Sequence, residues 1–460
     1  MESDTSGELA TFSLRGRPRA ITLEDEGLHH PTGSRRGGLI YTAYRDVTHL
    51  ATSSRAIWLG TRRSVYVIAR RTFVDPHGPE HLVRALLEQI ARQPGGSAQL
   101  ARMAQIEESA RGLHPLRATW GLFAVCVALY AVQLFDGGES VRVVGYFTGA
   151  LVADGDWWRV VTANLLHANA PHLILNLVGL LAVGALVERP LGTVATVCVM
   201  VGAGLGAMAG SVWSPLPVVG VSGILSGLVA TLLWLELRFA EVLPAWWRVP
   251  RRALFAVIGL TALLSLLPFV AAGAHAGGFA GGGIAAAALA WRGPRTRPSG
   301  IGLRALAGAS AAVAALAIAA AGGQLLHPGE FAVRHAERLR RLPNVSAEAL
   351  NEAAWNVAID EAASPEALEA ALELAERAAD DTDHAAAHIL DTLAEVHFQL
   401  GHRAEAVAAI EEAILRDPDE DYYREQRRRF LGERNAEDRP EYVPPEPQPK
   451  ARTEEPGLSV

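Results

Sequence analysis

Long apolar runs fill the middle of this 460-residue chain and constrain its fold more than any other feature. A stretch of roughly 20 apolar residues is long enough to cross a bilayer as a helix. We count seven such spans, near residues 118–135, 171–187, 193–212, 221–239, 253–270, 274–291 and 301–321. The pattern predicts a mainly α-helical, polytopic membrane bundle over residues 118–322, with soluble regions on both sides.

The composition narrows the function classes. The formal net charge of -7 is mild and argues against a nucleic-acid partner. Cys126 and Cys198 both lie in apolar runs, where a thiol is most simply a small hydrophobe, so no disulfide framework is expected.

The N-terminal flank has the pattern of a small soluble domain. Residues 1–18 are polar, which predicts disorder. Short runs rich in β-branched and aromatic residues then alternate with Gly, Ser and Arg clusters, at 21–23, 39–42, 56–59 and 65–68. With the amphipathic helix expected at 79–90, they predict an α+β domain over residues 19–110. Strands followed by one closing helix resemble a pleckstrin-homology-like domain, although an unrelated α+β module would give the same order.

The C-terminal flank has a helical and repetitive pattern over residues 330–435. Ala358, Ala371 and Ala378 recur 35 positions later as Leu393, Ala406 and Ala413. The second unit resembles a tetratricopeptide repeat, a helical pair that stacks into solenoids. An ordinary stack of helical hairpins is the alternative. We expect this domain to bind a protein partner or to act as a structural cap, and we expect the Pro- and Glu-rich tail at 436–460 to be disordered.

Basic residues in the short loops predict the orientation. Cytoplasmic loops carry an excess of Lys and Arg. Three clusters fall on one side of the seven-span arrangement: Arg102, Arg111 and Arg117; Arg248, Arg251 and Arg252; and Arg292, Arg295 and Arg297. The N-terminal domain is therefore expected in the cytoplasm and the C-terminal domain on the outer side, as in a multi-pass protein of a bacterial inner (plasma) membrane.

Four polar residues near the starts of apolar spans are the candidates for chemistry. Ser222 opens span four within Gly220-Val221-Ser222-Gly223, and His275 opens span six. His172 and Asn176 lie one helical turn apart near the start of span two. In the seven-span arrangement all four lie toward the outer side. Polar groups at such depth are costly and usually functional, although a packing face of small residues, a helix–helix hydrogen bond or a proton relay would also account for them singly.

Taken together, these residue types fit acyl transfer. A serine is a weak nucleophile unless a neighbouring base takes its proton, and His275 would be that base. Glycines spaced four apart, Gly223 with Gly227 and Gly278 with Gly282, let two helices approach closely enough for this contact. No acidic residue lies at a comparable depth in spans two, four or six, so we expect a Ser–His dyad rather than a triad.

The second requirement of acyl transfer is a set of donors for the developing oxyanion. The Ser222 backbone amide would lie at a helix N-terminus, where amides lack intrahelical partners. His172 and Asn176 project from one helix face and can both donate hydrogen bonds.

In this order along residues 150–290, the motifs resemble those of rhomboid intramembrane serine proteases. They are Trp158-Arg159, His167, the His172 and Asn176 pair, Glu188-Arg189, Gly220-Val221-Ser222-Gly223, and Ala274-His275 followed by Gly278 and Gly282. The resemblance implies that Ser222 is the nucleophile, His275 the general base, and His172 and Asn176 partners of the Ser222 amide in the oxyanion site. It also implies cleavage of single-pass membrane proteins in or near the transmembrane segment, within the bilayer and without a metal or cofactor.

One position departs from the family pattern. Many relatives carry an aromatic residue four positions after the nucleophile, stacked under the catalytic histidine, whereas this chain has Ser226. A proteolytically inactive, rhomboid-like protein that binds membrane clients is therefore one alternative. A transporter or proton pathway is another, weakened by the lack of acidic residues in the spans.

Overall fold

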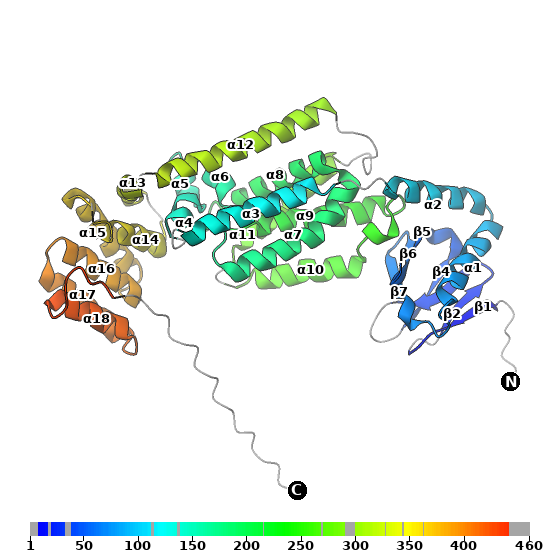
Figure 1. Cartoon of the computed structure of the whole chain (residues 1–460), viewed down its shortest axis with the longest axis horizontal. Helices are drawn as coiled ribbons and strands as arrows, with labels where there is room; N and C mark the ends of the chain where they lie inside the picture. Colours follow the sequence, from blue (N-terminus) through cyan, green and yellow to red (C-terminus); the bar gives the residue numbers. More distant parts are fainter. Residues whose placement is uncertain are drawn as a thin grey trace, which may run out of the picture. The chain divides into compact units, whose positions relative to one another are not determined.

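The computed structural model describes two compact units, Met1–Gly322 and Gly323–Val460 (Figure 1). The residues that it describes are 8–16, 20–32, 38–111, 115–135, 139–214, 216–267, 270–289, 300–326, 328–342, 345–361 and 363–440. Arg292, Arg295 and Arg297, one of the three basic clusters used to predict the orientation, lie outside these ranges.

The N-terminal region of the first unit contains two antiparallel sheets and two helices. The first sheet has the order β1 (Glu8–Ser13), β2 (Ala20–Glu24), β3 (Gly27–Pro31) and β4 (Leu39–Ala43). The second sheet has the order β5 (Val47–Thr52), β6 (Ala56–Thr61) and β7 (Val65–Ala69), and α1 (Gly78–Arg92) and α2 (Gly96–Arg111) follow. The four strands and the helix expected from the sequence are β2, β4, β6, β7 and α1. The pleckstrin-homology-like assignment stays a prediction.

The prediction of disorder over residues 1–18 is wrong for the part that forms β1. This strand pairs antiparallel with β2, from Glu8 opposite Glu24 to Ser13 opposite Ala20. Ala10 and Phe12 pack on a core that includes Ile21, Leu23 and Leu82. The alternation is short and weakly apolar, so only pairing with β2 makes it a strand. Residues 1–7 are not described.

Helices make up the described membrane region. They are α3 (Arg117–Phe135), α4 (Glu139–Gly145), α5 (Gly149–Ala153), α6 (Arg159–Thr162), α7 (Ala170–Leu191), α8 (Thr193–Gly210), α9 (Ser222–Phe239), α10 (Arg251–Leu264), α11 (Ala272–Leu289) and α12 (Ile301–Leu325). A short 3-10 turn, η3 (Ala245–Trp247), joins α9 to α10.

Each of the seven expected spans contains a helix, but only five of the described helices are long and apolar enough to cross a membrane: α3, α7, α8, α9 and α12. Helix α10 has 14 residues, because it ends at Leu264 rather than near residue 270. In helix α11, several glycines and His275 lower the mean hydropathy, and the helix packs between α8 and α9. The seven-span count and a six-helix core therefore stay predictions.

Glu188 joins the end of α7 to the start of α3. Its buried carboxylate accepts hydrogen bonds from the backbone amides of Ala118 and Thr119, at 2.8 and 2.9 Å, and from the hydroxyls of Thr119 and Thr193. The first amides of a helix lack intrahelical acceptors, so a carboxylate placed there caps α3 and interacts favourably with its dipole. The two helix ends must therefore lie at the same end of the bundle.

Arg248 joins the N-terminal domain to the loop after α9. Its buried guanidinium pairs with Glu236 at 2.6 and 2.8 Å and donates to the Thr61 carbonyl, at the end of β6, at 2.8 Å. Nearby, the Ala245 amide donates to His49 Nδ1. These contacts place the N-terminal domain at the end of α9 opposite Ser222.

The second unit is a series of helices joined by short connections. It contains α13 (Pro328–Arg341), α14 (Ala347–Ala358), α15 (Pro365–Asp381), α16 (Ala387–Gln399), α17 (Arg403–Arg416) and α18 (Asp421–Leu431). Each helix packs on the next in sequence. Ser346 and Ser364 cap α14 and α15 by accepting hydrogen bonds from the amides of Ala349 and Ala367. The assignment to tetratricopeptide repeats stays a prediction.

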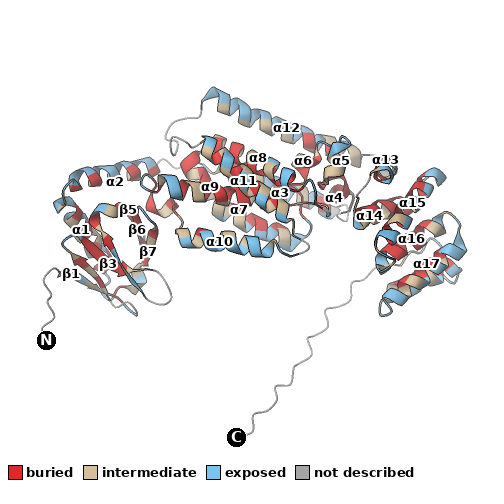
Figure 2. Cartoon of the chain, turned by 180° about the vertical axis from the view of Figure 1, so that it is seen from behind, coloured by how far each residue is buried: buried red, intermediate tan, exposed pale blue. Residues whose placement is uncertain are grey.

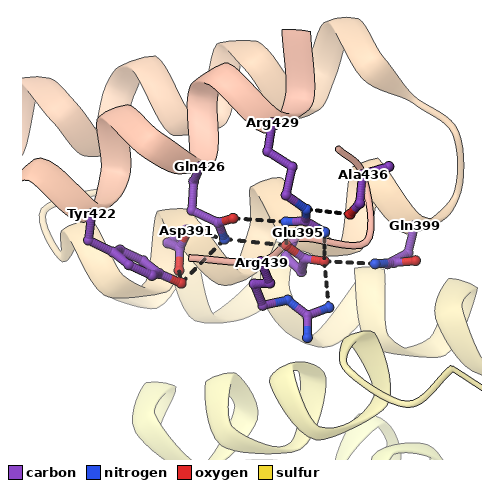
Figure 3. A network of polar contacts seen from close by, with 8 residues as sticks. All are labelled: Asp391, Glu395, Gln399, Tyr422, Gln426, Arg429, Ala436 and Arg439. Carbon is purple, nitrogen blue, oxygen red and sulfur yellow. Dashed lines mark hydrogen bonds and ion pairs between the residues drawn. The ribbon is translucent and has the colours of Figure 1, made fainter. Parts of the chain in front are cut away.

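A buried polar network ties α16 to α18 and to the segment that follows α18 (Figure 3). Arg429 donates to both carboxylate oxygens of Glu395, at 2.7 and 2.9 Å, and to the Ala436 carbonyl. Arg439 donates to Glu395 at 2.9 Å. The prediction of disorder from residue 436 onward is therefore wrong for residues 436–439, because these long-range contacts order the segment, whereas residues 441–460 are not described.

Candidate active site

Ser222 and His275 come together at one end of the bundle. Ser222 is the first residue of α9, and His275 lies in the first turn of α11. The distance between Ser222 Oγ and His275 Nε2 is 3.0 Å, a hydrogen-bond distance, and both side chains are half-buried. At this distance the imidazole can accept the hydroxyl proton as the oxygen attacks a carbonyl.

Glycines let α9 and α11 approach to this distance. A side chain on Gly278 would overlap the backbone of Gly223, and one on Gly282 would overlap the backbone of Gly227. Because the residue numbers increase in the same direction along both facing surfaces, α9 and α11 run parallel, and Ser222 and His275 meet near the start of both helices. These four glycines are the ones that the sequence placed on the facing surfaces.

A second glycine surface on α11 was not anticipated. Gly202, Gly206 and Gly210 of α8 face Gly281, Gly277 and Gly273 of α11, so these two helices are antiparallel. Side chains on any of these residues would overlap the opposite backbone, except at Gly202, where the nearest atom is the Ala285 Cβ at 2.9 Å. The spacing of four in both helices was the available signal. Helix α11 is thus held on two faces, which fixes the position of His275; the bundle interior is correspondingly buried (Figure 2).

His172 and Asn176 lie beside the backbone that leads into Ser222. Gly220 has a φ of +119°, and a Cβ on it would lie 2.7 Å from His172 Cε1 and 3.6 Å from Asn176 Nδ2. Asn176 is buried, and its Nδ2 has no hydrogen-bond partner among the described residues. An unpaired buried donor costs free energy, so a group that supplies an acceptor would bind favourably here. The Ser222 amide, at the first position of α9, adds a donor without an intrahelical acceptor.

The segment that precedes Ser222 is fixed to the loop region between α3 and α7. The Gly220 amide donates to the Ala163 carbonyl at 2.8 Å, and Phe147 and Val218 exchange two backbone hydrogen bonds of 3.0 Å. Buried Arg159 in turn donates to Asp156 and to the carbonyls of Val143 and Tyr146. The Trp158-Arg159 motif therefore has a structural role in this loop.

His167 lies close to His172 and is buried beside it. Its ring is fully buried, both ring nitrogens lack partners among the described residues, and its centroid lies 5.3 Å from that of His172. The ring packs edge-on against His172 and limits the positions that His172 can adopt.

Two further serines, Ser226 and Ser265, contact Ser222 and His275. Ser226 is buried, and its hydroxyl donates back to the Ser222 carbonyl at 3.1 Å. On the other side of the imidazole, Ser265 Oγ lies 2.8 Å from His275 Nδ1. Ser265 belongs to no motif that the sequence analysis identified; its signal was a hydroxyl near the end of an apolar run.

The described residues contain no group of three or more His, Cys, Asp or Glu side chains arranged to hold a metal ion. The arrangement around Ser222 supports nucleophilic chemistry by its own side chains. The expectation of a reaction without a cofactor stays a prediction.

The chain is similar to known proteins of one family. Residues 154–292 match the rhomboid domain family. The chain is 27% identical over 316 residues to "Rhomboid protease GluP" of Bacillus subtilis (strain 168), an alignment that covers 65% of this chain and 54% of that protein. It is 30% identical over 155 residues to "RHOMBOID-like protein 5" of Arabidopsis thaliana, covering 31% of this chain and 47% of that protein.

These matches support the assignment of the chain to the rhomboid family. The chain spans about half the length of the curated relatives that it matches. The rhomboid domain match contains Ser222, His275, His172 and Asn176, and it leaves out the N-terminal sheets and the second unit.

Proposed function

We propose that this chain is an intramembrane serine endopeptidase that cleaves membrane proteins in or near their transmembrane segments. The observation that carries the proposal is the 3.0 Å contact between Ser222 Oγ and His275 Nε2 at the N-terminal ends of two helices held together by glycines. The rhomboid domain match and the similarity to GluP, a protein named as a rhomboid protease, support it.

In the first half of the reaction, Ser222 Oγ attacks the scissile carbonyl carbon while its proton passes to His275 Nε2. The negative charge that develops on the carbonyl oxygen is stabilised by the Ser222 amide, Asn176 and His172. Gly220 has no side chain, so the carbonyl can approach these donors. The C–N bond then breaks, and the Nε2 proton passes to the leaving amine, which leaves an acyl group on Ser222.

In the second half, water attacks the acyl carbon and gives a proton to His275. The Ser222 ester bond breaks, and the proton returns to Ser222 Oγ. A substrate helix must unwind locally first, because a backbone paired within a helix cannot present its carbonyl to Ser222. Helix-breaking residues near the cleavage site would favour this step.

The proposal is tested with purified protein and a fluorescent transmembrane substrate. Ser222→Ala and His275→Ala are expected to lower the cleavage rate at least about 1,000-fold, because nucleophile and base act as a unit. Ser310→Ala is the control, since Ser310 is a serine of another apolar helix, α12, and its exposed hydroxyl donates to the Leu306 carbonyl of the same helix. Cleavage that persists in both site variants would exclude the dyad.

A fluorophosphonate probe separates the proposal from its main alternative, a client-binding protein without activity. Ser226, in place of the aromatic residue of many relatives, is the observation that favours this alternative. The protease is expected to become labelled at Ser222 only. A protein that binds a transmembrane client but neither cleaves it nor reacts with the probe would be the inactive form.

The proposal also includes the location and role of the two soluble regions. We place the N-terminal domain in the cytoplasm, and we assign to the helices of residues 330–435 the binding of a protein partner on the outer side of a bacterial inner membrane. The stacked helix pairs, typical of partner-binding domains, support this role.

A further inference from the structure

Ser265 is the first residue after α10, where it is the C-terminal cap. Its hydroxyl makes two contacts, each of 2.8 Å: one with the Thr261 carbonyl and one with His275 Nδ1. The second contact lies across the imidazole from Ser222. A continuous chain of polar atoms therefore runs from Ser222 through His275 and Ser265 to the Thr261 carbonyl.

The direction of each hydrogen bond in this chain follows from counting protons. A carbonyl oxygen can only accept, so the single proton of the Ser265 hydroxyl is directed to Thr261. Ser265 Oγ must then accept at its other contact, and His275 Nδ1 must carry the proton. In a neutral imidazole this leaves Nε2 without a proton, with its lone pair toward the Ser222 hydroxyl.

We infer that Ser265 is a positioning residue that holds His275 in the Nδ1–H tautomer and fixes its ring orientation. The inference rests on the proposed function, because a base at Nε2 matters only if Ser222 is the nucleophile. When Nε2 takes the Ser222 proton, Nδ1 keeps its own proton and its bond to Ser265. No charge moves to Ser265, so its role is orientation.

This role accounts for the absence of a ring at position 226. An imidazole that no aromatic residue stacks against can rotate unless another group holds it. The Ser226 hydroxyl donates to the Ser222 carbonyl instead of holding the imidazole. Ser265 supplies the constraint from α10 instead, so the position of the α10 end becomes part of the site.

The first test measures the tautomer directly. In protein labelled with ¹⁵N-histidine, the two ring nitrogens of His275 are assigned by comparison with His275→Asn. Wild type is expected to show a protonated Nδ1 and an unprotonated Nε2. Ser265→Val is expected to give a mixture of tautomers. Ser265→Thr is expected to keep the wild-type pattern, because threonine has the shape of valine but retains the hydroxyl.

The second test measures activation of the nucleophile through the rate of fluorophosphonate labelling. Ser265→Val is expected to lower the rate at least about tenfold, a part of what general-base catalysis contributes, and Ser265→Thr is expected to restore most of it. Ser211→Ala is the matched control. Ser211 is the C-terminal cap of α8, and its hydroxyl also donates to a carbonyl four residues back, that of Ala207, at 2.8 Å.

The outcomes separate this inference from the proposed function. A protonated Nε2 in wild type, or equal labelling rates for Ser265→Val and Ser265→Thr, would overturn the positioning role while leaving Ser222 as the nucleophile. If wild type does not react with the probe at all, the proposed function fails, and the tautomer measurement still decides whether Ser265 orients His275.

Discussion

At the scale of single residues, Gly220 shows how a backbone conformation that favours glycine leaves room for the side chains of the site. Its φ of +119° disfavours any side chain, and a Cβ there would lie 2.7 Å from one atom of His172 and 3.0 Å from another. We expect Gly220→Ala to lower the cleavage rate at least about tenfold, since displacing one oxyanion donor commonly costs more than that. The measurement is kcat/KM on a transmembrane substrate.

Gly192 provides the control for backbone strain at Gly220. It joins α7 to α8 with a φ of +77°, and a Cβ there would meet no atom within 4 Å. Gly192→Ala should lower the free energy of unfolding by about 1–3 kcal/mol, the usual cost of a residue held in this region, and leave kcat/KM near that of wild type. If both variants lose activity equally, the effect of Gly220→Ala is strain alone.

Single residues also show how far the sequence predicts the site. Ser222, His275, His172 and Asn176 could be selected because each is a polar residue where polar residues are costly. Ser265 could not, because its contact with His275 depends on where α10 ends. Helix α10 ends at Leu264, shortly before Pro268, where helices usually stop, whereas the expected apolar span continued to residue 270.

At the scale of elements, the helices of the membrane region could be predicted from apolar length, but their ends and most of their partners could not. The glycine spacing predicted the contact of α9 with α11 through Gly223 and Gly278, but the contact between α8 and α11 was missed. A spacing of four shows that a helix has a face of small residues, but it does not identify the helix that lies against that face.

The pairing of α16 with α18 makes the stability of the second unit dependent on pH. Burial and then the charge of Glu395 raise the pKa of Asp391 to about 7. Burial opposes ionisation of Glu395, but the hydrogen bonds from Arg429 and the charges of Arg439 and Arg429 outweigh it and lower its pKa to about 2. The folded state therefore binds a proton at Asp391 that the unfolded state releases from about pH 4 upward.

As the pH rises from about 4 to about 7, the free energy of unfolding should therefore fall, because the unfolded state loses the Asp391 proton first. As the pH falls below about 4, the free energy of unfolding should also fall, because Glu395 becomes protonated more readily in the unfolded state. Asp391→Asn removes the first effect and should stabilise α16 at pH 8 by on the order of 2 kcal/mol. Hydrogen exchange of α16 amides in the full chain, at pH 5 and pH 8, measures this difference. Asp421→Asn, at a carboxylate whose side chain is 90% exposed, is the control.

At the scale of the whole molecule, buried polar contacts show which parts of the first unit lie at the end of the bundle opposite Ser222. Arg248 holds the N-terminal domain at the end of α9 opposite Ser222, and Glu188 places the start of α3 beside the end of α7. Since α7 and α9 both begin near the Ser222 site, the N-terminal domain and the first membrane helix share the other end. That end carries Arg117, Arg248, Arg251 and Arg252, the residues that predict the cytoplasmic side.

Helix α12 then decides on which side the second unit lies. It has 25 residues, and only 6% of its apolar window is buried within the protein, so most of its surface is available to lipid. We expect it to cross the membrane and carry the second unit to the outer side. A reporter that is active only outside the cytoplasm should therefore be active when fused after about residue 330 and inactive when fused to the N-terminal domain.

The same fusions distinguish the other arrangements. Activity of the N-terminal fusion alone would mean that the whole bundle has the opposite orientation, with Ser222 open to the cytoplasm. Inactivity of both fusions would mean that α12 does not cross, and the second unit would then meet partners in the cytoplasm. The measurement therefore decides on which side of the membrane the second unit meets its partners.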